Sequence, residues 1–276
     1  MPVFNRILVT RRFISCLKKQ TNQNFHLIVI DDGSTDGTSD FITKELKNST
    51  ILKGNGNLWW GGSLHKGYKW VKKNLIDDDN FILIINNDTE FDGNFLQTGI
   101  NLLNLKDKTI YGAQCHDKYT GLLFDKGVTI NWKNMTYNQA VHPEFINCLS
   151  TRGLFLKLKD YLEIGGLHPV LLPHYGSDYE YTIRAKTMGY TLLTTDTLRV
   201  WTDDKNKRDH DYLSSGLFHY LKTVFSKKKN FKDNPIYYCI FIILTSPRKL
   251  IIKNCFRIIK EWILEVLVVC SIIKSL

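Results

Sequence analysis

The sequence decides its fold in residues 82–91, which read ILIINNDTEF. A run of large apolar residues stops abruptly at amides and carboxylates, which is typical of a strand buried on both faces of a parallel sheet. In open α/β sheets ligands bind just beyond the carboxyl ends of the strands, so we expect Asp88 at the rim of a crevice. Asn86 lies beside it, and both offer the oxygen ligands that hard divalent cations prefer. The alternative is a plain loop, because Asn-Asn-Asp is also a turn composition.

A second acidic strand end lies upstream. Residues 27–30 (LIVI) predict a short strand, and DDGSTDGT follows at residues 31–38. Asp31 and Asp32 would then point into the same crevice as Asp88. The glycines allow a tight turn, and a threonine or aspartate of this turn can cap the helix that follows. An Asx turn with a helix cap explains the end of this segment but not two adjacent acids at a strand end.

A glycine-rich segment with two tryptophans, GNGNLWWGGS at residues 54–63, precedes a helix expected from about residue 64 to 75. Glycines next to a helix N-terminus let backbone N–H groups approach a phosphate, and an indole offers a face for a base or sugar. The tryptophans can equally be one core residue and one surface anchor. The candidate ligand contacts in this segment are Trp60, Gly61 and Gly62.

The start of the chain, PVFNR at residues 2–6, looks like the end of a strand that runs into a loop. Together with VIDDGSTDGT at 29–38 and NND at 86–88, in a strand–helix–strand–helix order, it resembles the family 2 glycosyltransferases, rhamnosyltransferase-like. The resemblance covers about residues 2–202. It implies an α/β fold of the GT-A type, a Rossmann-like mixed, mainly parallel sheet flanked by helices. The first strand would be unusually short.

The resemblance also implies an activity, a hexosyl- or deoxyhexosyltransferase that moves a sugar from a nucleotide diphosphate donor with inversion at the anomeric carbon. Asp31 and Asp32 fall where the family holds the base and ribose. Asp88 falls on the last acid of the family's D-x-D metal motif, which implies Mg²⁺ or Mn²⁺ as cofactor. Asn86 stands where the first acid usually is, and an amide oxygen is still a ligand for a hard cation.

A metal at Asp88 would act as a Lewis acid and offset the charge of the departing nucleotide diphosphate. Many relatives add a histidine after the strand expected at residues 191–201. This chain has Thr202 and Asp203 there, of which the aspartate is the better substitute.

The acceptor half is expected from residue 109, with strands at 109–116 and 122–132. The segment TRGLFL at 151–156 resembles the part of the family that runs beneath the acceptor. His174 precedes the helix expected after residue 176. A lone histidine is more often structural than a ligand contact. The candidate acceptor contacts are Arg152, Gly153, His174 and Glu180.

Residues 174–185 read HYGSDYEYTIRA and predict the start of a helix that ends near Gly189. Inverting transfer passes through an oxocarbenium-like state and needs a carboxylate that deprotonates the acceptor hydroxyl. Asp178 matches the position of that base in the family, and Glu180 matches the acid two residues later. The alternative is a capping box formed by Ser177 and Glu180, which leaves Asp178 unexplained.

The C-terminal part changes in composition. The chain carries a net charge of +10, and many of its basic residues lie beyond residue 204. The apolar run at 236–244 is shorter than the ~20 residues that span a bilayer, whereas 250–276 predicts an amphipathic helix lying in a membrane interface. The alternative is a helix packed on the catalytic domain or on a partner subunit. Nucleic acid is not expected as a partner, because aliphatic stretches interrupt the basic residues.

We therefore expect a GT-A domain at residues 1–204, with a nucleotide-sugar-binding half at 1–108 and an acceptor half at 109–204. A basic helical tail at 205–276 would associate with a membrane. The six cysteines form no C-x-x-C pair, and no signal peptide opens the chain, which together favour the cytoplasm, at the inner membrane face. The expected acceptor is a glycan or lipid-linked molecule. One rival is a catalytically silent nucleotide-sugar-binding protein. Another is a nucleotidyltransferase, but this sequence lacks the lysine-bearing glycine loop expected at the start of such an enzyme.

Overall fold

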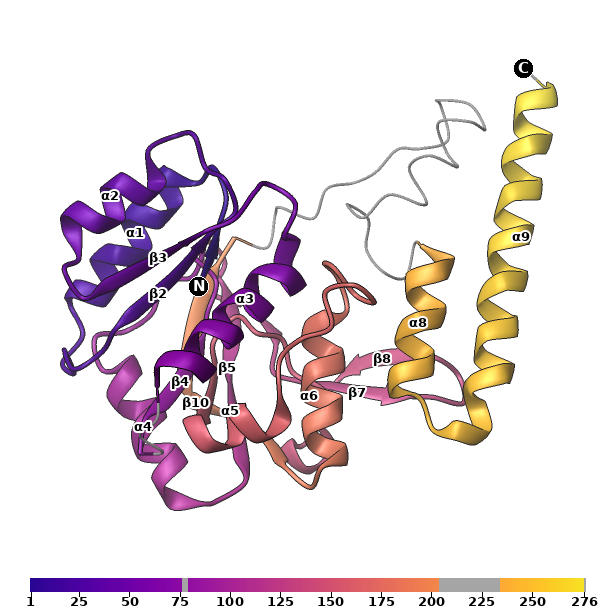
Figure 1. Ribbon diagram of the computed structural model, residues 1–276. Coiled ribbons are helices and arrows are strands. Elements are labelled where there is room, and N and C mark those ends of the chain that lie inside the picture. Colours follow the sequence, from indigo (N-terminus) through magenta and orange to yellow (C-terminus); the bar gives the residue numbers. More distant parts are fainter. Residues whose placement is uncertain (76–78, 204–233, 276) are drawn as a thin grey trace.

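Strand β2 (Leu27–Asp31) shows how the layers of the molecule arise from its sequence. Alternate side chains of a strand point to opposite faces of a sheet. Val29 packs with the helices α1 (Ile7–Lys18) and α2 (Thr38–Glu45), whereas Ile30 lies against Gly67 of α3. The computed structural model, which describes residues 1–75, 79–203 and 234–275, repeats this division in its other strands. The result is a sheet layer between two helical layers (Figure 1).

Two hydrophobic clusters fill the space on either side of the sheet layer. One lies beneath α1, α2 and α4 (Phe95–Leu105) and contains Phe13, Phe95 and Phe155. The other lies beneath α3 (Trp59–Asn74), α5 (Leu158–Ile164) and α6 (Ser177–Thr187). The α/β sheet flanked by helices that the sequence predicts is confirmed.

The strands form two main ladders. The first is parallel and has the order β1 (Pro2–Val3), β2 and β3 (Ser49–Lys53). The second is mixed, with the order β10 (Thr191–Thr202), β5 (Thr109–Asp117), β9 (Leu154–Lys157) and β4 (Phe81–Ile84). Among the described residues no ladder joins β1 to β4, in keeping with the predicted short first strand.

Three local predictions need correction. Strand β4 pairs antiparallel with β9, and its first three residues are only half-buried, so it is not a strand buried in a parallel sheet. Helix α3 begins at Trp59, so the glycine pair Gly61 and Gly62 lies inside its first turns.

The third correction concerns residues 122–132, which form two strands, β6 (Leu123–Asp125) and β7 (Val128–Asn131). The break occurs because Gly127 between them has a φ of 96° and its turn fits against Ile146. Strand β7 continues into a hairpin with β8 (Thr136–Gln139).

The C-terminal part forms a helical hairpin, α8 (Pro235–Thr245) and α9 (Ile251–Ser275), which run antiparallel at one end of the molecule (Figure 1). Asn234 caps α8 by accepting hydrogen bonds from the backbone N–H groups of Ile236 and Tyr237. Phe241 and Ile242 of α8 are buried in a third cluster with α6 and β7. Two short 3₁₀ turns, Pro143–Phe145 and Arg248–Leu250, complete the described elements.

The alternative of a tail packed on the catalytic domain therefore holds for α8 and the first turns of α9. The lysine-rich part of the predicted tail, including Lys227 to Lys229, lies outside the described residues. Within the described ranges, no helix combines the length and apolar character that crossing a bilayer requires.

Candidate active site

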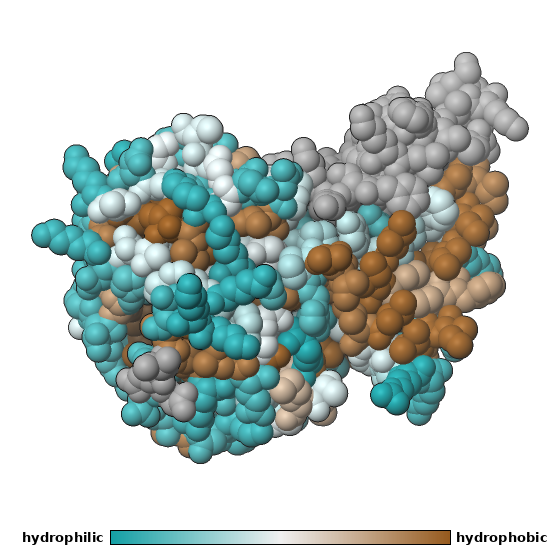
Figure 2. Space-filling view, in the orientation of Figure 1, coloured by the Kyte–Doolittle hydropathy of each residue, from teal (hydrophilic) through white to brown (hydrophobic). Residues whose placement is uncertain are grey.

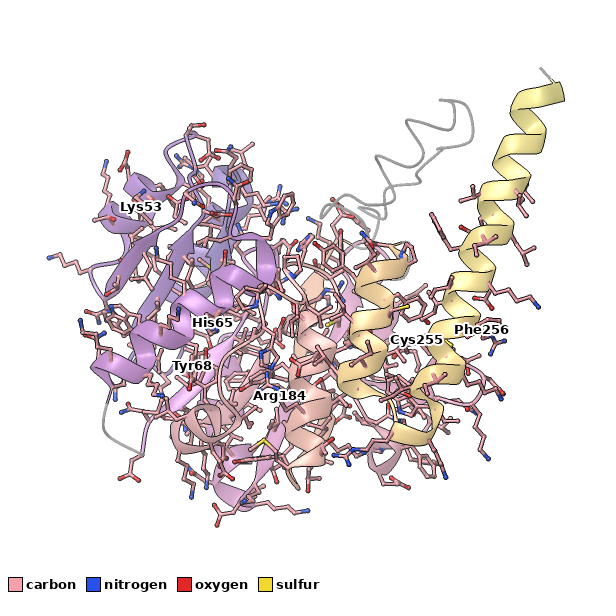
Figure 3. The ribbon with its side chains drawn as sticks, turned by 45° about the vertical axis from the view of Figure 1, so that its right-hand side comes forward. Lys53, His65, Tyr68, Arg184, Cys255 and Phe256 are labelled. Atoms are coloured by element: carbon pink, nitrogen blue, oxygen red, sulfur yellow. The ribbon has the colours of Figure 1, made fainter. Side chains whose placement is uncertain are left out.

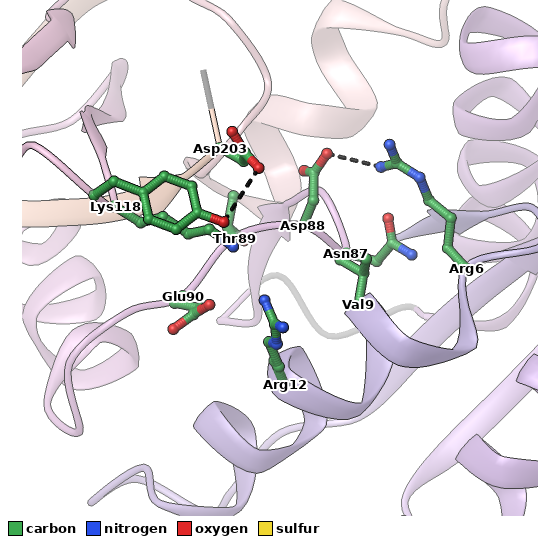
Figure 4. A pocket seen from close by; sticks show the side chains of 10 residues that line it. Arg6, Val9, Arg12, Asn87, Asp88, Thr89, Glu90, Lys118 and Asp203 are labelled. Atoms are coloured by element: carbon green, nitrogen blue, oxygen red, sulfur yellow. Dashed lines mark hydrogen bonds and ion pairs between the residues drawn. The ribbon is translucent and has the colours of Figure 1, made fainter. Parts of the chain in front are cut away.

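A cavity of about 150 Å³ lies where the loop after β4 meets the start of α1 and the ends of β5 and β10 (Figure 4). Its lining is strongly charged and contains both signs. The cationic members are Arg6, Arg12 and Lys118, and the acidic members are Asp88, Glu90 and Asp203. A charged cavity at strand ends is suited to a phosphate-bearing ligand.

The loop that carries Asp88 is held by its neighbours. Asn87 is buried and donates a hydrogen bond to Thr10 Oγ1 of α1 (2.9 Å), and Thr89 Oγ1 donates to the backbone carbonyl of Asn86 (2.8 Å). Asp88 Oδ2 accepts from Arg6 Nη1 at 2.8 Å, and its side chain is 29% exposed. The predicted metal-binding acid thus lies at the cavity, paired with an arginine from the first loop.

Asp31 is fully buried and bonded to the protein on both oxygens. Oδ1 accepts from the backbone N–H of Ser34 (2.8 Å), and Oδ2 accepts from Ser39 Oγ and from Lys53 Nζ (2.8 Å). Burial acts to raise the pKa of Asp31, but the hydrogen bonds from Lys53, Ser39 and Ser34 outweigh it and lower the pKa to about 2. This carboxylate is ionised and fixed in the turn.

Asp32 is bonded in a similar way. Its Oδ1 accepts from the backbone N–H of Gly56 (2.9 Å), and its Oδ2 accepts from those of Leu58 (2.9 Å) and Trp59 (3.1 Å). Asp32 therefore satisfies donors at the N-terminus of α3, which otherwise lack intrahelical partners. The two acids expected at the base and ribose both organise the turn after β2 and the loop between β3 and α3.

The glycine pair at the start of α3 packs against the loop before α6. The N–H of Gly61 donates to the carbonyl of Pro173 (2.8 Å), and a Cβ at this position would lie 2.5 Å from the Leu172 carbonyl oxygen. The N–H of Gly62 donates to the Leu58 carbonyl within the helix. Trp60 Nε1 donates to Thr151 Oγ1 (3.2 Å). These N–H groups are engaged by the protein, and contact of this segment with a donor stays a prediction.

Arg152 links the two halves electrostatically. Its guanidinium lies 3.5 Å from Asp125 Oδ2 and stacks over Phe124. Burial acts to lower the pKa of Arg152, but the charges of Asp125, Asp178 and Asp88, together with Cys115, raise it. The charges of the predicted metal-binding acid and of the predicted base thus both contribute to the pKa of Arg152, after those of Cys115 and Asp125, and its direct acidic contact is Asp125.

Asp178 lies in the first turn of α6, after Gly176 in the left-handed conformation (φ 81°). Its Oδ1 accepts from the backbone N–H of Tyr179 (2.9 Å). Burial raises the pKa of Asp178 to about 6, against the opposing effects of that hydrogen bond and of Arg152. A carboxyl group with this pKa is ionised for the most part at pH 7 and still basic enough to accept a proton.

The predicted capping box does not form. Ser177 Oγ donates to the carbonyl of His174, and Gly176 occupies the N-cap. Glu180 is buried and accepts two hydrogen bonds from Arg184, at 2.8 and 3.1 Å. Because Arg184 also donates to the carbonyl of Gly166 (2.9 Å), this pair fixes the loop after α5. Glu180 thus contributes to the fold at the site of an expected acceptor contact.

The two remaining acceptor candidates lie in different surroundings. His174 packs beside Trp59 with ring centroids 5.6 Å apart, and burial lowers its pKa to about 4, so it is neutral at pH 7. Gly153 lies in the sheet layer, where a Cβ would approach that of Ala113 to 2.9 Å. His174 is placed to offer an aromatic surface, and Gly153 to permit close packing.

The residues near Asp88 fit a divalent cation that brings further ligands with its substrate. Asn86 Oδ1 is buried and has no hydrogen-bond partner among the described residues, so it is an orphaned carbonyl oxygen of the kind such ions bind. Within the same residues no cluster of three histidine, cysteine or acidic ligands occurs. Mg²⁺ is often held by one or two carboxylates plus substrate phosphates, which suits Asp88 in the cavity lining, whereas Asn86 is not among the residues that line the cavity.

Sequence reasoning missed the cationic part of the cavity and the partner of Arg152. Arg6 lies three residues after the first strand, so its position just beyond a strand end was an available signal. Asp125 also ends a strand, β6, but the break at Gly127 was not predicted. Arg12 and Lys118 carry no local signal, because only the tertiary fold brings them to the cavity.

Comparisons with known proteins identify the fold. GalNAc-T7, solved with UDP, GalNAc and Mn²⁺, superposes with a TM-score of 0.59 at 11% identity over 81% of this chain and 46% of its own. The mannosyltransferase PcManGT from Pyrobaculum calidifontis, solved with GDP-Man and Mn²⁺, gives 0.55 at 11% identity over 99% and 78%. TarS of S. aureus gives 0.55 at 13% identity over 89% and 43%.

At these identities the likeness shows the fold alone, which is GT-A, and the chain spans less than half the length of two of these three proteins. No curated protein matches the sequence significantly. A family model described as glycosyl transferase family 2 matches residues 1–158, which is more than half of the chain. The chain therefore belongs to glycosyl transferase family 2.

Proposed function

We propose that this glycosyltransferase is inverting and moves a hexosyl or deoxyhexosyl group from a nucleotide diphosphate donor to a lipid-linked or polysaccharide acceptor. The carrying observation is the cavity at the strand ends, which Arg6, Arg12 and Lys118 line together with Asp88, in a chain that matches glycosyl transferase family 2. A cationic lining of this kind suits the diphosphate of a nucleotide-sugar donor. Asp178 and Asp88 both contribute, after Cys115 and Asp125, to the raised pKa of Arg152, which is compatible with a site that both acids face.

Asp178 is the proposed general base. Its carboxylate would take the proton from the acceptor hydroxyl as that oxygen bonds to the anomeric carbon, and the bond to the diphosphate breaks on the opposite side. The Tyr179 N–H bonded to Oδ1 would orient the group. The positive charge of Arg152 would limit the rise in the pKa of Asp178 that burial causes, so the carboxyl group would stay ionised for the most part at pH 7.

The cavity at Asp88 is the proposed diphosphate site. Arg6 and Arg12 of the first loop and helix, with Lys118 across the cavity, would offset the charge of the phosphates. Asn86 and Asp88 would hold Mg²⁺ or Mn²⁺, which when bound supplies Lewis-acid stabilisation of the leaving group. We expect Mn²⁺ to increase donor-dependent thermal stabilisation and Asp88→Asn to remove that increase.

The replacement Asp178→Asn tests the proposed base. Transfer should fall by ~10²- to 10⁴-fold, because a positioned base contributes that much, while donor binding is retained. The matched control is Asp107→Asn, which removes a carboxylate that is 74% exposed in a surface ion pair with Lys157. Transfer at the wild-type rate in Asp178→Asn would contradict the assignment.

A second candidate is a catalytically silent nucleotide-sugar-binding protein. It is favoured by the two-residue β1 and by Asn86, which stands in place of an acid. A panel of nucleotide sugars with Mn²⁺ separates the two functions. Thermal stabilisation by a donor without any product or hydrolysis would support the silent protein, and turnover would exclude it.

The acceptor and location form the remaining part of this proposal. A lipid-linked acceptor at the inner face of a membrane is supported by the basic, apolar C-terminal hairpin. The reducing, cytoplasmic setting expected from the cysteine spacing is part of the same proposal. The division into a donor half (1–108), an acceptor half (109–204) and a membrane-associating tail (205–276) stays a prediction.

A further inference from the structure

The hairpin of α8 and α9 exposes a continuous apolar surface. On α9 five exposed apolar residues follow one another at intervals of three or four, which places them on one face of the helix, and the exposed Leu264 and Val268 lie beside that face. Ile252 is 84% exposed and Phe256 is 70% exposed. In Figure 2 the hydrophobic residues gather over α8 and α9, whereas the rest of the visible surface is mainly polar. We name this surface the hairpin face, and its members are Ile236, Ile243, Leu244, Ile252, Phe256, Ile259, Ile263 and Leu267.

The opposite side of α9 explains why the hairpin face cannot turn inward. Asn254 and Ile258 are buried, and Asn254 Nδ2 donates to the carbonyl of Trp132 beside the β7–β8 hairpin (2.9 Å). Cys255 Sγ contacts the Cys239 carbonyl of α8. Figure 3 shows Cys255 between the two helices and Phe256 on the outer side of α9. The apolar surface is therefore fixed outward.

Basic residues border the hairpin face. Arg248 and Lys249 lie at the turn, and Lys253, Arg257 and Lys260 each follow a face residue by one position, so they line one flank; all five are exposed. The same stretch, residues 248–268, contains two acids, Glu261 and Glu265, so its net charge is 5 − 2 = +3. Arg257 already pairs with Glu261 at 3.0 Å. A second copy of the chain would present the same positive charge and be repelled from this surface. An anionic partner surface would be attracted to it.

We propose that the hairpin face docks on an anionic lipid bilayer, with α8 and α9 lying in the headgroup plane and their apolar side chains entering the acyl boundary. Large exposed apolar patches rimmed by charge mark such contact sites.

The docking would also orient the enzyme. Phe241 of α8 is buried in the cluster that contains Ile183 of α6, and Asp178 lies on that same helix. The bilayer surface and the proposed base are thus joined by one packed core. Orientation toward a lipid-linked acceptor rests on the proposed function, whereas docking itself does not.

Vesicle co-sedimentation of the full chain, without donor or metal, tests the docking. Wild type should bind phosphatidylcholine vesicles that contain phosphatidylglycerol, and more weakly those without it. The double variant Ile252→Glu/Phe256→Glu should bind roughly 10- to 100-fold more weakly, because two exposed apolar side chains no longer enter the bilayer. Lys253→Gln/Lys260→Gln should lose about fivefold per residue on the anionic vesicles alone, and added salt should mimic it.

The matched control is Leu105→Glu/Val141→Glu, which changes two apolar residues that are 77% and 73% exposed outside the hairpin. It should bind like wild type, and all variants should keep the wild-type thermal transition. Failure of wild type to bind the anionic vesicles, or equal binding of wild type and the face variant, overturns the proposal. The proposal is also overturned if wild type forms a dimer that Ile252→Glu/Phe256→Glu dissociates, while wild type does not bind vesicles. The hairpin face would then join two copies of the chain. Transfer to a water-soluble acceptor is unaffected by either outcome.

Discussion

The two acids at the end of β2 and the acid of α6 differ in how many hydrogen bonds the protein makes to them. Asp31 and Asp32 accept six hydrogen bonds from the protein between them, and the pKa of Asp31 is lowered to about 2. Asp178 accepts one, from its neighbour, and burial raises its pKa to about 6. The first two are occupied as structural acceptors, and the third is left available for a proton.

The largest effect should appear in the pH dependence of transfer. If Asp178 is the base, kcat/KM should rise about tenfold per pH unit below about pH 6 and level off above it, because only the ionised carboxylate accepts a proton. In Asp178→Asn the acid limb should vanish, and the rate should lie ~10²- to 10⁴-fold below the wild-type plateau. An unchanged acid limb in the variant would assign the titration to another group. Asp178 would then no longer differ from Asp31 and Asp32 in being available for a proton.

The next effect concerns the occupied acids. Asp32→Ala should lower the free energy of unfolding by about 2 to 4 kcal/mol, because it leaves the N–H groups of Gly56, Leu58 and Trp59 without their acceptor. Urea denaturation measures this. The control Asp40→Ala, on the exposed side of α2, should stay within about 0.5 kcal/mol of wild type. A stable Asp32→Ala that no longer binds donor would place Asp32 in the site instead.

A smaller effect of opposite sign should follow from the raised pKa of Asp178. The folded chain binds this proton more tightly than the unfolded chain, whose aspartate has a pKa of 3.8, so stability falls as the pH rises from about 4 to 6. At pH 7 Asp178→Asn should therefore raise the free energy of unfolding by about 1 to 3 kcal/mol. At pH 3.5 the gain should disappear. Destabilisation at pH 7 would show that Asp178 is structural too.

The smallest effect separates packing from ligand contact in the glycine pair. Gly61→Ala should destabilise the protein by about 1 to 2 kcal/mol, because its Cβ would meet the Leu172 carbonyl, which cannot move freely. Gly62→Ala meets Leu58 at an ordinary distance of 3.4 Å and should be neutral or stabilising by up to about 1 kcal/mol. Thermal unfolding with and without donor is the measurement. Loss of donor stabilisation in a well-folded Gly62→Ala would restore a ligand role to the pair.

The sequence predicted the family and the acidic strand ends after β2 and β4, because these depend on local apolar runs and turn chemistry, but it did not predict β8 and β9. It could not predict that Asp32 would satisfy the start of α3, since the partner N–H groups lie more than twenty residues away. The capping box failed for a similar reason. Arg184 takes both oxygens of Glu180 once the loop after α5 folds against α6.

The cavity illustrates the same limit. Asp88 was found from its place at a strand end, but the arginine that pairs with it comes from 82 residues earlier. The net charge of +10 does not indicate where on the fold an anionic ligand would bind. The packing of α1 against the loop after β4, through Asn87 and Thr10, brings Arg6 and Arg12 to the cavity. Lys118 reaches it from the loop after β5.

The shortness of β1 has a mechanical consequence. With only Pro2 and Val3 in its ladder, the parallel sheet of the donor half meets the mixed sheet through side-chain packing within the described residues, rather than through shared backbone hydrogen bonds. A small rotation of one sheet against the other would then slide apolar surfaces and break no ladder. The seam runs beside Arg6 and Asp88, and near it individual hydrogen bonds, from Asn87 Nδ2 to Thr10 Oγ1 and from the Thr21 N–H to the Gly93 carbonyl, tie α1 and the loop that follows it to the segment after β4.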